Sequence, residues 1–145
     1  MNKRFNKALY EKHDQVGKET ALSLLQQIGY VLENDVEAYK RYDFIVSLSS
    51  KPFKIEVEQK NGWTGIDFPF QTHDVPFRKH SSQANIFIQI NSDATALALC
   101  PMKDVKASEV ITKNTIYTNN EKFFAIPKEK MKYYFKKQDG WYEYD

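Results

Sequence analysis

The chain has 145 residues, of which 41% are hydrophobic and 28% charged, with a net charge of +2 and a pI of about 8.5. This length favours a single domain, residues 1–145, with its own core. The only cysteine, Cys100, excludes an intramolecular disulfide and a cysteine-based zinc site, and it is expected in the core. No signal peptide is evident and no apolar run approaches the ~18 residues of a membrane span, so we expect a cytoplasmic protein without membrane contact.

The amino-terminal part of the chain is expected to be helical over residues 3–28. Apolar residues recur there at three-to-four spacing, which is typical of an amphipathic helix. Gly17 is a point at which this helix could divide in two, and Gly29 fits a carboxy-terminal cap. A short strand over 30–32 and a polar connection over 34–42 are expected next.

A pair of strands is predicted in the next segment, over residues 43–49 and 53–60, with 49–52 as the turn. Glycine and proline then recur over 61–76, which predicts a long loop. Two aromatic residues of this loop, Trp63 and Phe68, can either close a core or stack on bases.

The remaining elements follow from alternation and from turn residues. We expect strands over 84–90 and 95–100, a short helix from Pro101 to about Ala107, a hairpin of 110–118 with 121–126, and a helix over 128–137. This order predicts an α/β or α+β fold with a central mixed sheet, not a doubly wound repeat.

The strand over 53–60 carries the charges that point to function. Side chains at i and i+2 of a strand share a face, so Glu56, Glu58 and Lys60 point one way while Ile55 and Val57 point the other. Charges on so apolar a strand are unfavourable to bury unless they are paired or bind a cation. Asp43 opens the preceding apolar run, fifteen residues before Glu58, and supplies a second carboxylate for a shared cation.

At these residues the chain resembles the PD-(D/E)XK nuclease superfamily. The matching features are Glu19 in the first helix, Asp43 at a strand start, and Glu58-Gln59-Lys60 in the next strand. Small Holliday-junction resolvases and restriction-type or homing endonucleases of this superfamily share the arrangement. The resemblance extends over roughly residues 15–90.

The resemblance implies a restriction-endonuclease-like sheet flanked by helices, followed here by a carboxy-terminal hairpin and helix. It implies a DNA endonuclease that uses Mg²⁺ or Mn²⁺, because a hard cation stabilises the charge of phosphodiester cleavage. Asp43, Glu58 and the Gln59 carbonyl are the implied metal ligands. Lys60 would orient water or offset charge, and Glu19 would approach from the helix.

Two alternatives to this site remain open. Glu56 can be the metal acid, with Glu58 at the lysine position of the motif. Glu58 and Lys60 can also be a simple ion pair on a structural module, since exposed pairs are common and weak. Motifs of other enzyme classes, such as a glycine-rich phosphate loop, HExxH or GxSxG, are absent from the sequence.

Basic residues indicate how DNA would be held. Arg78, Lys79 and His80 precede the strand beside the motif, and His80 is also a candidate for proton transfer. Lys132 and Lys136 belong to a lysine-rich stretch between residues 122 and 137. One site per subunit favours a homodimer for cutting both strands of a duplex or branched DNA. The alternative function is nucleic-acid binding without catalysis.

Overall fold

The structure, a computed structural model, describes residues 7–35, 43–115 and 118–144, without the side chains of 7–14 and 34–35. Within these residues the chain forms ten strands and four helical segments. The strands are β1 (Val31–Asp35), β2 (Phe44–Leu48), β3 (Lys51–Lys60), β4 (Thr72–Pro76), β5 (Ile86–Asn91), β6 (Ala96–Pro101), β7 (Glu109–Lys113), β8 (Glu121–Pro127), β9 (Lys132–Lys137) and β10 (Gly140–Tyr144). The helices are α1 (Lys7–Ile28) and α2 (Met102–Lys106), with the 3₁₀ turns η1 (Phe77–Ser81) and η2 (Lys128–Lys130).

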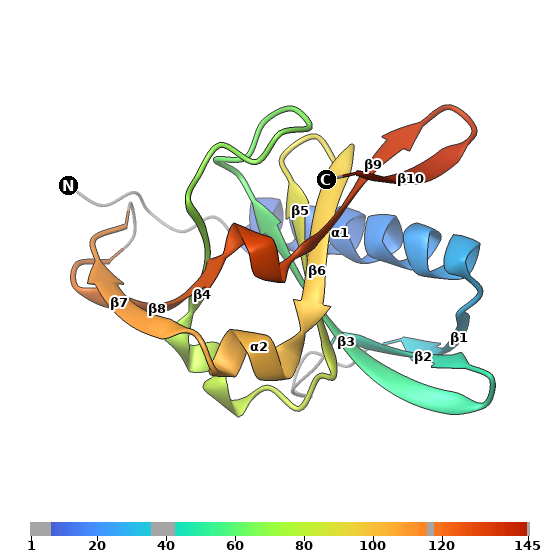
Figure 1. The fold of residues 1–145 in the computed structure, drawn as a ribbon, viewed down its shortest axis with the longest axis horizontal. Helices are drawn as coiled ribbons and strands as arrows, with labels where there is room; N and C mark the ends of the chain where they lie inside the picture. Colours follow the sequence, from blue (N-terminus) through green and yellow to red (C-terminus); the bar gives the residue numbers. More distant parts are fainter. Residues whose placement is uncertain (1–6, 36–42, 116–117, 145) are drawn as a thin grey trace.

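Two sheets organise these elements (Figure 1). The large sheet has the order β1-β2-β3-β5-β6-β9-β10, and the small sheet has the order β4-β8-β7. Among the described strands only β3 and β5 pair in parallel. A parallel pair needs a crossover connection, and here β4 and η1 provide it on the face of the large sheet opposite α1.

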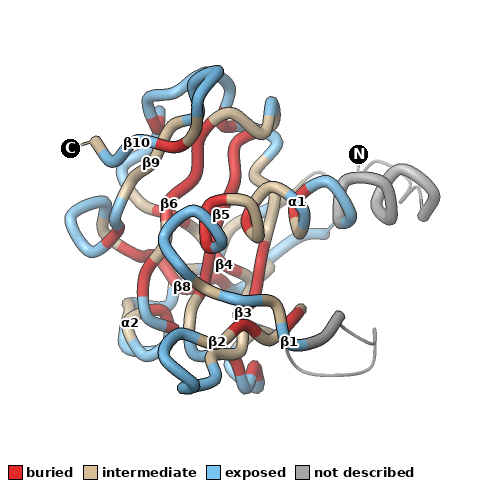
Figure 2. The backbone as a smooth tube through the Cα atoms, turned by 90° about the vertical axis from the view of Figure 1, so that its right-hand side faces the viewer, coloured by how far each residue is buried: buried red, intermediate tan, exposed pale blue. Residues whose placement is uncertain are grey.

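The central strands of the large sheet are largely buried (Figure 2). Hydrophobic cores lie on both faces of this sheet. The core beneath α1 contains Ala21, Leu24, Leu25, Phe44, Val46, Ile55, Val57, Ile88, Ile90, Leu97 and Trp141. The core between the two sheets includes Trp63, Phe68, Val75, Phe87, Ala96, Ala98, Cys100, Phe124 and Ile126. Strands buried on both faces are nearly continuous apolar runs, so any charge on them needs a partner.

The expected mixed sheet is present, and Cys100 is buried as expected. The strand over 84–90, the strand over 95–100 and the short helix after Pro101 are confirmed in outline by β5, β6 and α2. Of the pairing expected between 110–118 and 121–126, the structure shows β7 paired with β8 and ending at Lys113, and residues 116–117 lie outside the described part of the chain. None of the described helices is long and apolar enough to cross a membrane.

Two predicted elements are wrong. The helix expected over 128–137 is instead η2 followed by strand β9, because the aromatic residues of this segment pair with β6. The loop expected over 61–76 ends in strand β4, whose residues alternate between buried and partly buried. One face of the large sheet is therefore covered by strands where flanking helices were expected.

Smaller differences concern turns. Helix α1 is not divided at Gly17, where a Cβ would lie 3.5 Å from the Val57 side chain. Gly29 caps the helix as expected, with φ +124°. The β2–β3 turn needs only Ser49 and Ser50, both at positive φ, so β3 begins at Lys51.

The connection expected over 34–42 is still strand at Asn34 and Asp35. Residues 36–42 lie outside the described part of the chain.

The hairpin formed by β9 and β10 is tied to α1 by the amide side chain of Gln27. Gln27 Nε2 donates to the Trp141 carbonyl oxygen at 2.8 Å, and Gln27 Oε1 accepts from the Trp141 N–H at 2.7 Å. The Trp141 indole N–H also donates to Ser23 Oγ at 3.0 Å. The side-chain amide of Gln27 therefore pairs with the Trp141 backbone as a residue of a neighbouring strand would.

We expect Gln27→Leu to lower the free energy of unfolding by about 1–2 kcal/mol, because two hydrogen bonds are lost. Urea unfolding monitored by tryptophan fluorescence measures this change. Gln26→Leu is the matched control, since the neighbouring exposed Gln26 forms no side-chain hydrogen bond with the described residues. Equal stability of the two variants would contradict the anchoring role of Gln27.

Candidate active site

The carboxyl half of β3 presents Glu56, Glu58 and Lys60 to the small sheet. The alternate residues Ile55 and Val57 pack beneath α1, as strand geometry requires. The three charged side chains therefore face the crossover segment that contains β4 and η1. This confirms the shared face expected from the sequence.

Asp43 lies beside this half of β3, directly before β2. Its backbone N–H donates to the Ile55 carbonyl oxygen at 2.6 Å. Its carboxylate Oδ2 accepts from the Val57 N–H, also at 2.6 Å. Phe44 pairs with Ile55, so Asp43 lies opposite Glu56 in the continuing register. The Asp43 side chain thus replaces a backbone carbonyl where the β2–β3 ladder ends.

Glu56 is buried, and its carboxylate is held by two side chains of the crossover. Lys79 Nζ on η1 donates to Glu56 Oε2 at 2.7 Å, and Ser82 Oγ donates to Oε1 at 3.4 Å. The side chain of Glu56 is only 8% exposed, whereas that of Lys79 is 24% exposed. This ion pair joins η1 to β3 and gives Glu56 a structural partner.

Glu58 lies two residues further along β3 and is half-buried. Gln89 Nε2 on β5 donates to Glu58 Oε1 at 2.9 Å, while Glu58 Oε2 accepts no hydrogen bond from the described residues. Burial raises the pKa of Glu58, and the Gln89 hydrogen bond and the charges of Lys79 and Lys60 oppose this rise. Glu58 is therefore a partly desolvated carboxyl with one oxygen available.

The charges of three carboxylates act on the pKa of Lys79. Burial by itself lowers its pKa, but the charges of Glu56, Glu58 and Asp43 outweigh that effect, and the pKa is raised. Lys79 is therefore bonded to Glu56 and is stabilised at longer range by the charges of Glu58 and Asp43. We call Asp43, Glu56 and Glu58 the carboxylate cluster.

Lys60 borders the carboxylate cluster at the end of β3. Its ammonium group lies 5.4 Å from the centroid of the Phe70 ring. Burial and the nearby charge of Lys113 lower the pKa of Lys60, while Glu58 and Asp74 raise it. Lys60 is half-buried, so the structure keeps it on the Glu58 side of the strand and out of open solvent.

A buried polar chain leads away from Glu58, and sequence reasoning missed it. Gln89 Oε1 lies 2.7 Å from His73 Nδ1, and His73 Nε2 lies 2.8 Å from the Tyr133 hydroxyl. His73 and Gln89 are fully buried. The available signal was Gln89 itself, a polar residue inside the apolar run of β5. His73 also stacks on Phe68 at 3.6 Å between ring centroids.

The structure does not bring Glu19 to this site. Glu19 is exposed on α1, accepts a hydrogen bond from Gln15 Nε2 at 3.0 Å, and belongs to the helix on the opposite face of the sheet. The Gln59 side chain also points away from Glu58, and its Nε2 donates to Asn91 and Ser92 carbonyl oxygens at 3.3 and 3.1 Å. Only the backbone of Gln59 remains a candidate ligand.

The expected DNA-binding residues divide into two separate groups. Arg78 and His80 are exposed on η1 beside the carboxylate cluster, where Lys79 is already paired. Lys132 and Lys136 are exposed on β9, and Lys132 lies 3.6 Å from Glu143.

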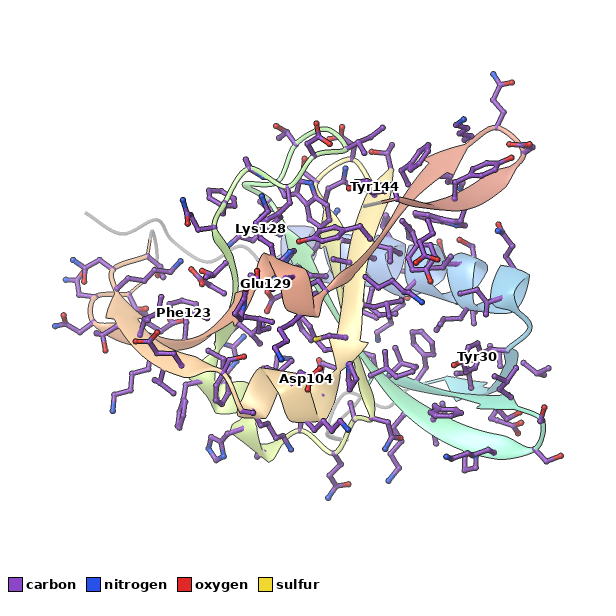
Figure 3. The ribbon with its side chains drawn as sticks, viewed as in Figure 1. Tyr30, Asp104, Phe123, Lys128, Glu129 and Tyr144 are labelled. Carbon is purple, nitrogen blue, oxygen red and sulfur yellow. The ribbon has the colours of Figure 1, made fainter. Side chains whose placement is uncertain are left out.

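A groove of about 710 Å³ lies beside β9, and its lining includes Lys132 and Tyr133. Figure 3 labels Lys128 and Glu129 from η2 and Tyr144 from β10, which line the same groove. Trp63 and Phe68 are buried between the sheets, which supports the expectation that they close a core.

The carboxylate cluster offers the ligand type that Mg²⁺ prefers, but it is not a complete cage. Within residues 15–33, 43–115 and 118–144, no three His, Cys, Asp or Glu side chains converge closely enough to hold one metal ion. Mg²⁺ usually binds only one or two carboxylates together with water and phosphate. Glu58, with one available oxygen, and Asp43, bonded to the Val57 N–H of the same strand, are the two carboxylates that could serve that mode of binding.

Comparisons with family models, curated proteins and solved structures found no match for this chain.

Burial of His73 should make stability depend on pH. Burial lowers the pKa of His73 from 6.5 to about 4. Between these pH values the unfolded chain binds a proton that the folded chain does not, so stability falls as the pH falls. This contribution is fully present above pH 6.5, and about 3 kcal/mol of it is lost by pH 4.

Urea unfolding at several pH values between 7 and 5, where carboxyl groups contribute least, measures the effect. His73→Gln should flatten the dependence of the unfolding free energy on pH, while His80→Gln, at an exposed site, should keep the parental slope. If the unfolding free energy of His73→Gln kept the parental dependence on pH, a group other than His73 would bind the proton on unfolding.

Proposed function

We propose that the chain is a metal-dependent DNA endonuclease whose site is centred on Asp43 and Glu58. The observation that carries this proposal is that the Asp43 carboxylate is bonded to the backbone of β3 at Val57, next in sequence to Glu58, whose Oε2 accepts no hydrogen bond from the described residues. The element order also supports it, since Asp43 directly precedes β2 and the next strand, β3, carries Glu58 and Lys60. This is the order that the PD-(D/E)XK resemblance implies.

Asp43 and Glu58 are the residues that would hold Mg²⁺ or Mn²⁺, with the Gln59 carbonyl as a further ligand. The ion would stabilise charge on the phosphoryl oxygens and make water more acidic. The chain's own contribution is to fix the carboxylates, Asp43 through the Val57 N–H and Glu58 through Gln89. Ligands held in place before binding lose little freedom when substrate arrives.

The two lysines of the site have different roles in this proposal. Lys60 lies beside Glu58, and no carboxylate of the described residues lies within bonding distance of its ammonium group. It supplies positive charge toward a phosphate. Lys79 is bonded to Glu56 and holds η1 against β3. Glu56 is accordingly the structural acid and Glu58 the metal acid, which is the first of the two registers considered from the sequence.

The proposed substrate is duplex or branched DNA. Arg78 and His80 are exposed beside the carboxylate cluster and can meet the phosphate backbone there. One cluster per chain cuts one strand at a time, so cutting both strands favours a symmetric homodimer.

The decisive experiment incubates supercoiled plasmid and a four-way junction with the protein and Mg²⁺, or with EDTA. We expect cleavage only with Mg²⁺, and we expect Glu58→Gln and Asp43→Asn to abolish it while duplex binding in EDTA is retained. Glu56→Gln is the matched control on the same strand face. It should lower the unfolding free energy, because Lys79 loses its buried partner, yet still allow cleavage.

The outcomes separate the candidate functions. Binding without cleavage in the parent would favour the alternative of a nucleic-acid-binding protein without catalysis. Absence of both would leave the carboxylate cluster as a structural ion network. Inactive Glu56→Gln together with active Glu58→Gln would move the metal acid to Glu56.

The basic residues should differ in how they affect salt dependence. Each phosphate contact that is lost should flatten the plot of log affinity against log salt by about one unit. We expect Arg78→Ala to flatten the slope and to slow cleavage, because Arg78 adjoins the carboxylate cluster. Lys132→Ala/Lys136→Ala should flatten the slope without changing the cleavage rate of bound DNA.

Fluorescence anisotropy of a labelled duplex over a salt series, together with single-turnover cleavage, measures both effects. Lys103→Ala, at an exposed position on α2, is the control and should leave the slope unchanged. Parental slopes in all variants would remove the electrostatic support for DNA as the partner.

A further inference from the structure

Four side chains from four strands form an unbroken polar chain between Glu58 and the groove beside β9. The chain passes from Glu58 on β3 to Gln89 on β5, then to His73 on β4 and Tyr133 on β9, with heavy-atom separations of 2.9, 2.7 and 2.8 Å. Its inner members Gln89 and His73 are fully buried. Tyr133 lines the groove and so forms the outer end of the chain.

The direction of each of the three hydrogen bonds between Glu58 and Tyr133 follows from the charge of Glu58. A carboxylate only accepts, so the amide nitrogen of Gln89 must face Glu58 and the amide oxygen must face His73. His73 Nδ1 must then carry the proton, which leaves Nε2 as the acceptor for the Tyr133 hydroxyl. All three donors are therefore aligned toward Glu58.

A neutral His73 is what this arrangement needs. Burial lowers the pKa of His73 to about 4, so the ring is neutral near pH 7 and can accept at Nε2 while it donates at Nδ1. The aromatic rings of Phe68 and Trp63 pack against His73 and restrict its orientation. Gln89 is further held by a 3.5 Å contact from Nε2 to the Asp74 carbonyl oxygen.

We propose that Gln89, His73 and Tyr133 are positioning residues, which hold the Glu58 carboxylate in the orientation that binds the divalent cation. This inference rests on the proposed function, since Glu58 is the metal acid in both. Partners behind a metal ligand orient it, and their loss typically weakens metal binding by about 10–100-fold. Gln89 acts directly on Glu58, whereas His73 and Tyr133 act through Gln89.

The first test needs neither metal nor DNA. Long-range ¹⁵N–¹H spectra of histidine-labelled protein at pH 7 report which ring nitrogen carries the proton, with His73→Gln used for assignment. We expect the His73 signal to show the Nδ1–H form, which free histidine disfavours. An Nε2–H form would reverse Gln89, bring its oxygen against Glu58, and overturn the proposal.

The second test measures Mn²⁺ affinity of the folded chain by water proton relaxation. Gln89→Met keeps the length of the side chain but cannot donate, and it should weaken Mn²⁺ binding by about 10–100-fold. Tyr133→Phe should weaken binding by a smaller factor and raise the fraction of the Nε2–H form of His73. Duplex binding in EDTA should stay at the parental level in both variants.

Tyr144→Phe is the matched control for Tyr133→Phe. Tyr144 lines the same groove, and its hydroxyl donates to the Ile66 carbonyl oxygen at 2.7 Å, so Tyr144→Phe also loses one hydrogen bond. No hydrogen bond joins Tyr144 to His73. It should leave Mn²⁺ affinity and the His73 tautomer unchanged. If the two tyrosine variants had equal effects, the hydrogen-bonded side chains from Glu58 to Tyr133 would contribute only to stability in general.

Failure of this inference is distinguishable from failure of the proposed function. If the parent binds Mn²⁺ and cuts DNA while Gln89→Met and Tyr133→Phe bind Mn²⁺ as the parent does, the positioning role is wrong and the function stands. If the parent neither binds Mn²⁺ nor cuts DNA, both the function and the role at a metal ligand are wrong. In that case an Nδ1–H form of His73 would assign the polar chain to the stability of the core.

Discussion

Strand β3 is buried on both faces, yet its carboxyl half carries two glutamates and a lysine. The apolar side of the strand packs beneath α1 through Ile55 and Val57, and the opposite side meets the small sheet. A charge in such a place is tolerated only with partners, because desolvation of an ion costs several kcal/mol. The need to satisfy these charges explains the arrangement of the segments that surround β3.

The crossover from β3 to β5 meets this need. A parallel pair of strands requires a connection that passes over one face of the sheet, and here that connection brings Lys79 to Glu56 and His73 to Gln89. At the other edge of β3, the Asp43 carboxylate accepts the Val57 N–H where the β2 ladder ends. The topology of the sheet thus brings cations and hydrogen-bond donors to carboxylates from which they are distant in sequence. The same geometry leaves Glu58 with one available oxygen.

Much of the fold could be predicted because its signals are local. Alternation located β2, β3, β5 and β6, and the position of Pro101 located the start of α2. The segment over 128–137 was misread because lysine-rich sequences are common in helices, whereas Tyr133 and Phe135 pair with β6 in the structure. Strand β4 was missed because Pro76 and nearby glycines indicated a loop, while its pairing with β8 lies about fifty residues away in sequence. In both segments long-range pairing outweighed local preference.

The sequence by itself determined which charges share a face of β3 and that Asp43 begins the neighbouring strand, since a period of two is a property of the extended backbone. It could not determine that Lys79 pairs with Glu56, that Glu19 lies on the opposite face, or that Gln89, His73 and Tyr133 join in one chain. These contacts join residues between 16 and 60 positions apart. Only the tertiary structure decides them, because a hydrogen bond or an ion pair forms where the packing of sheets brings two groups within about 3 Å, whatever their separation in sequence.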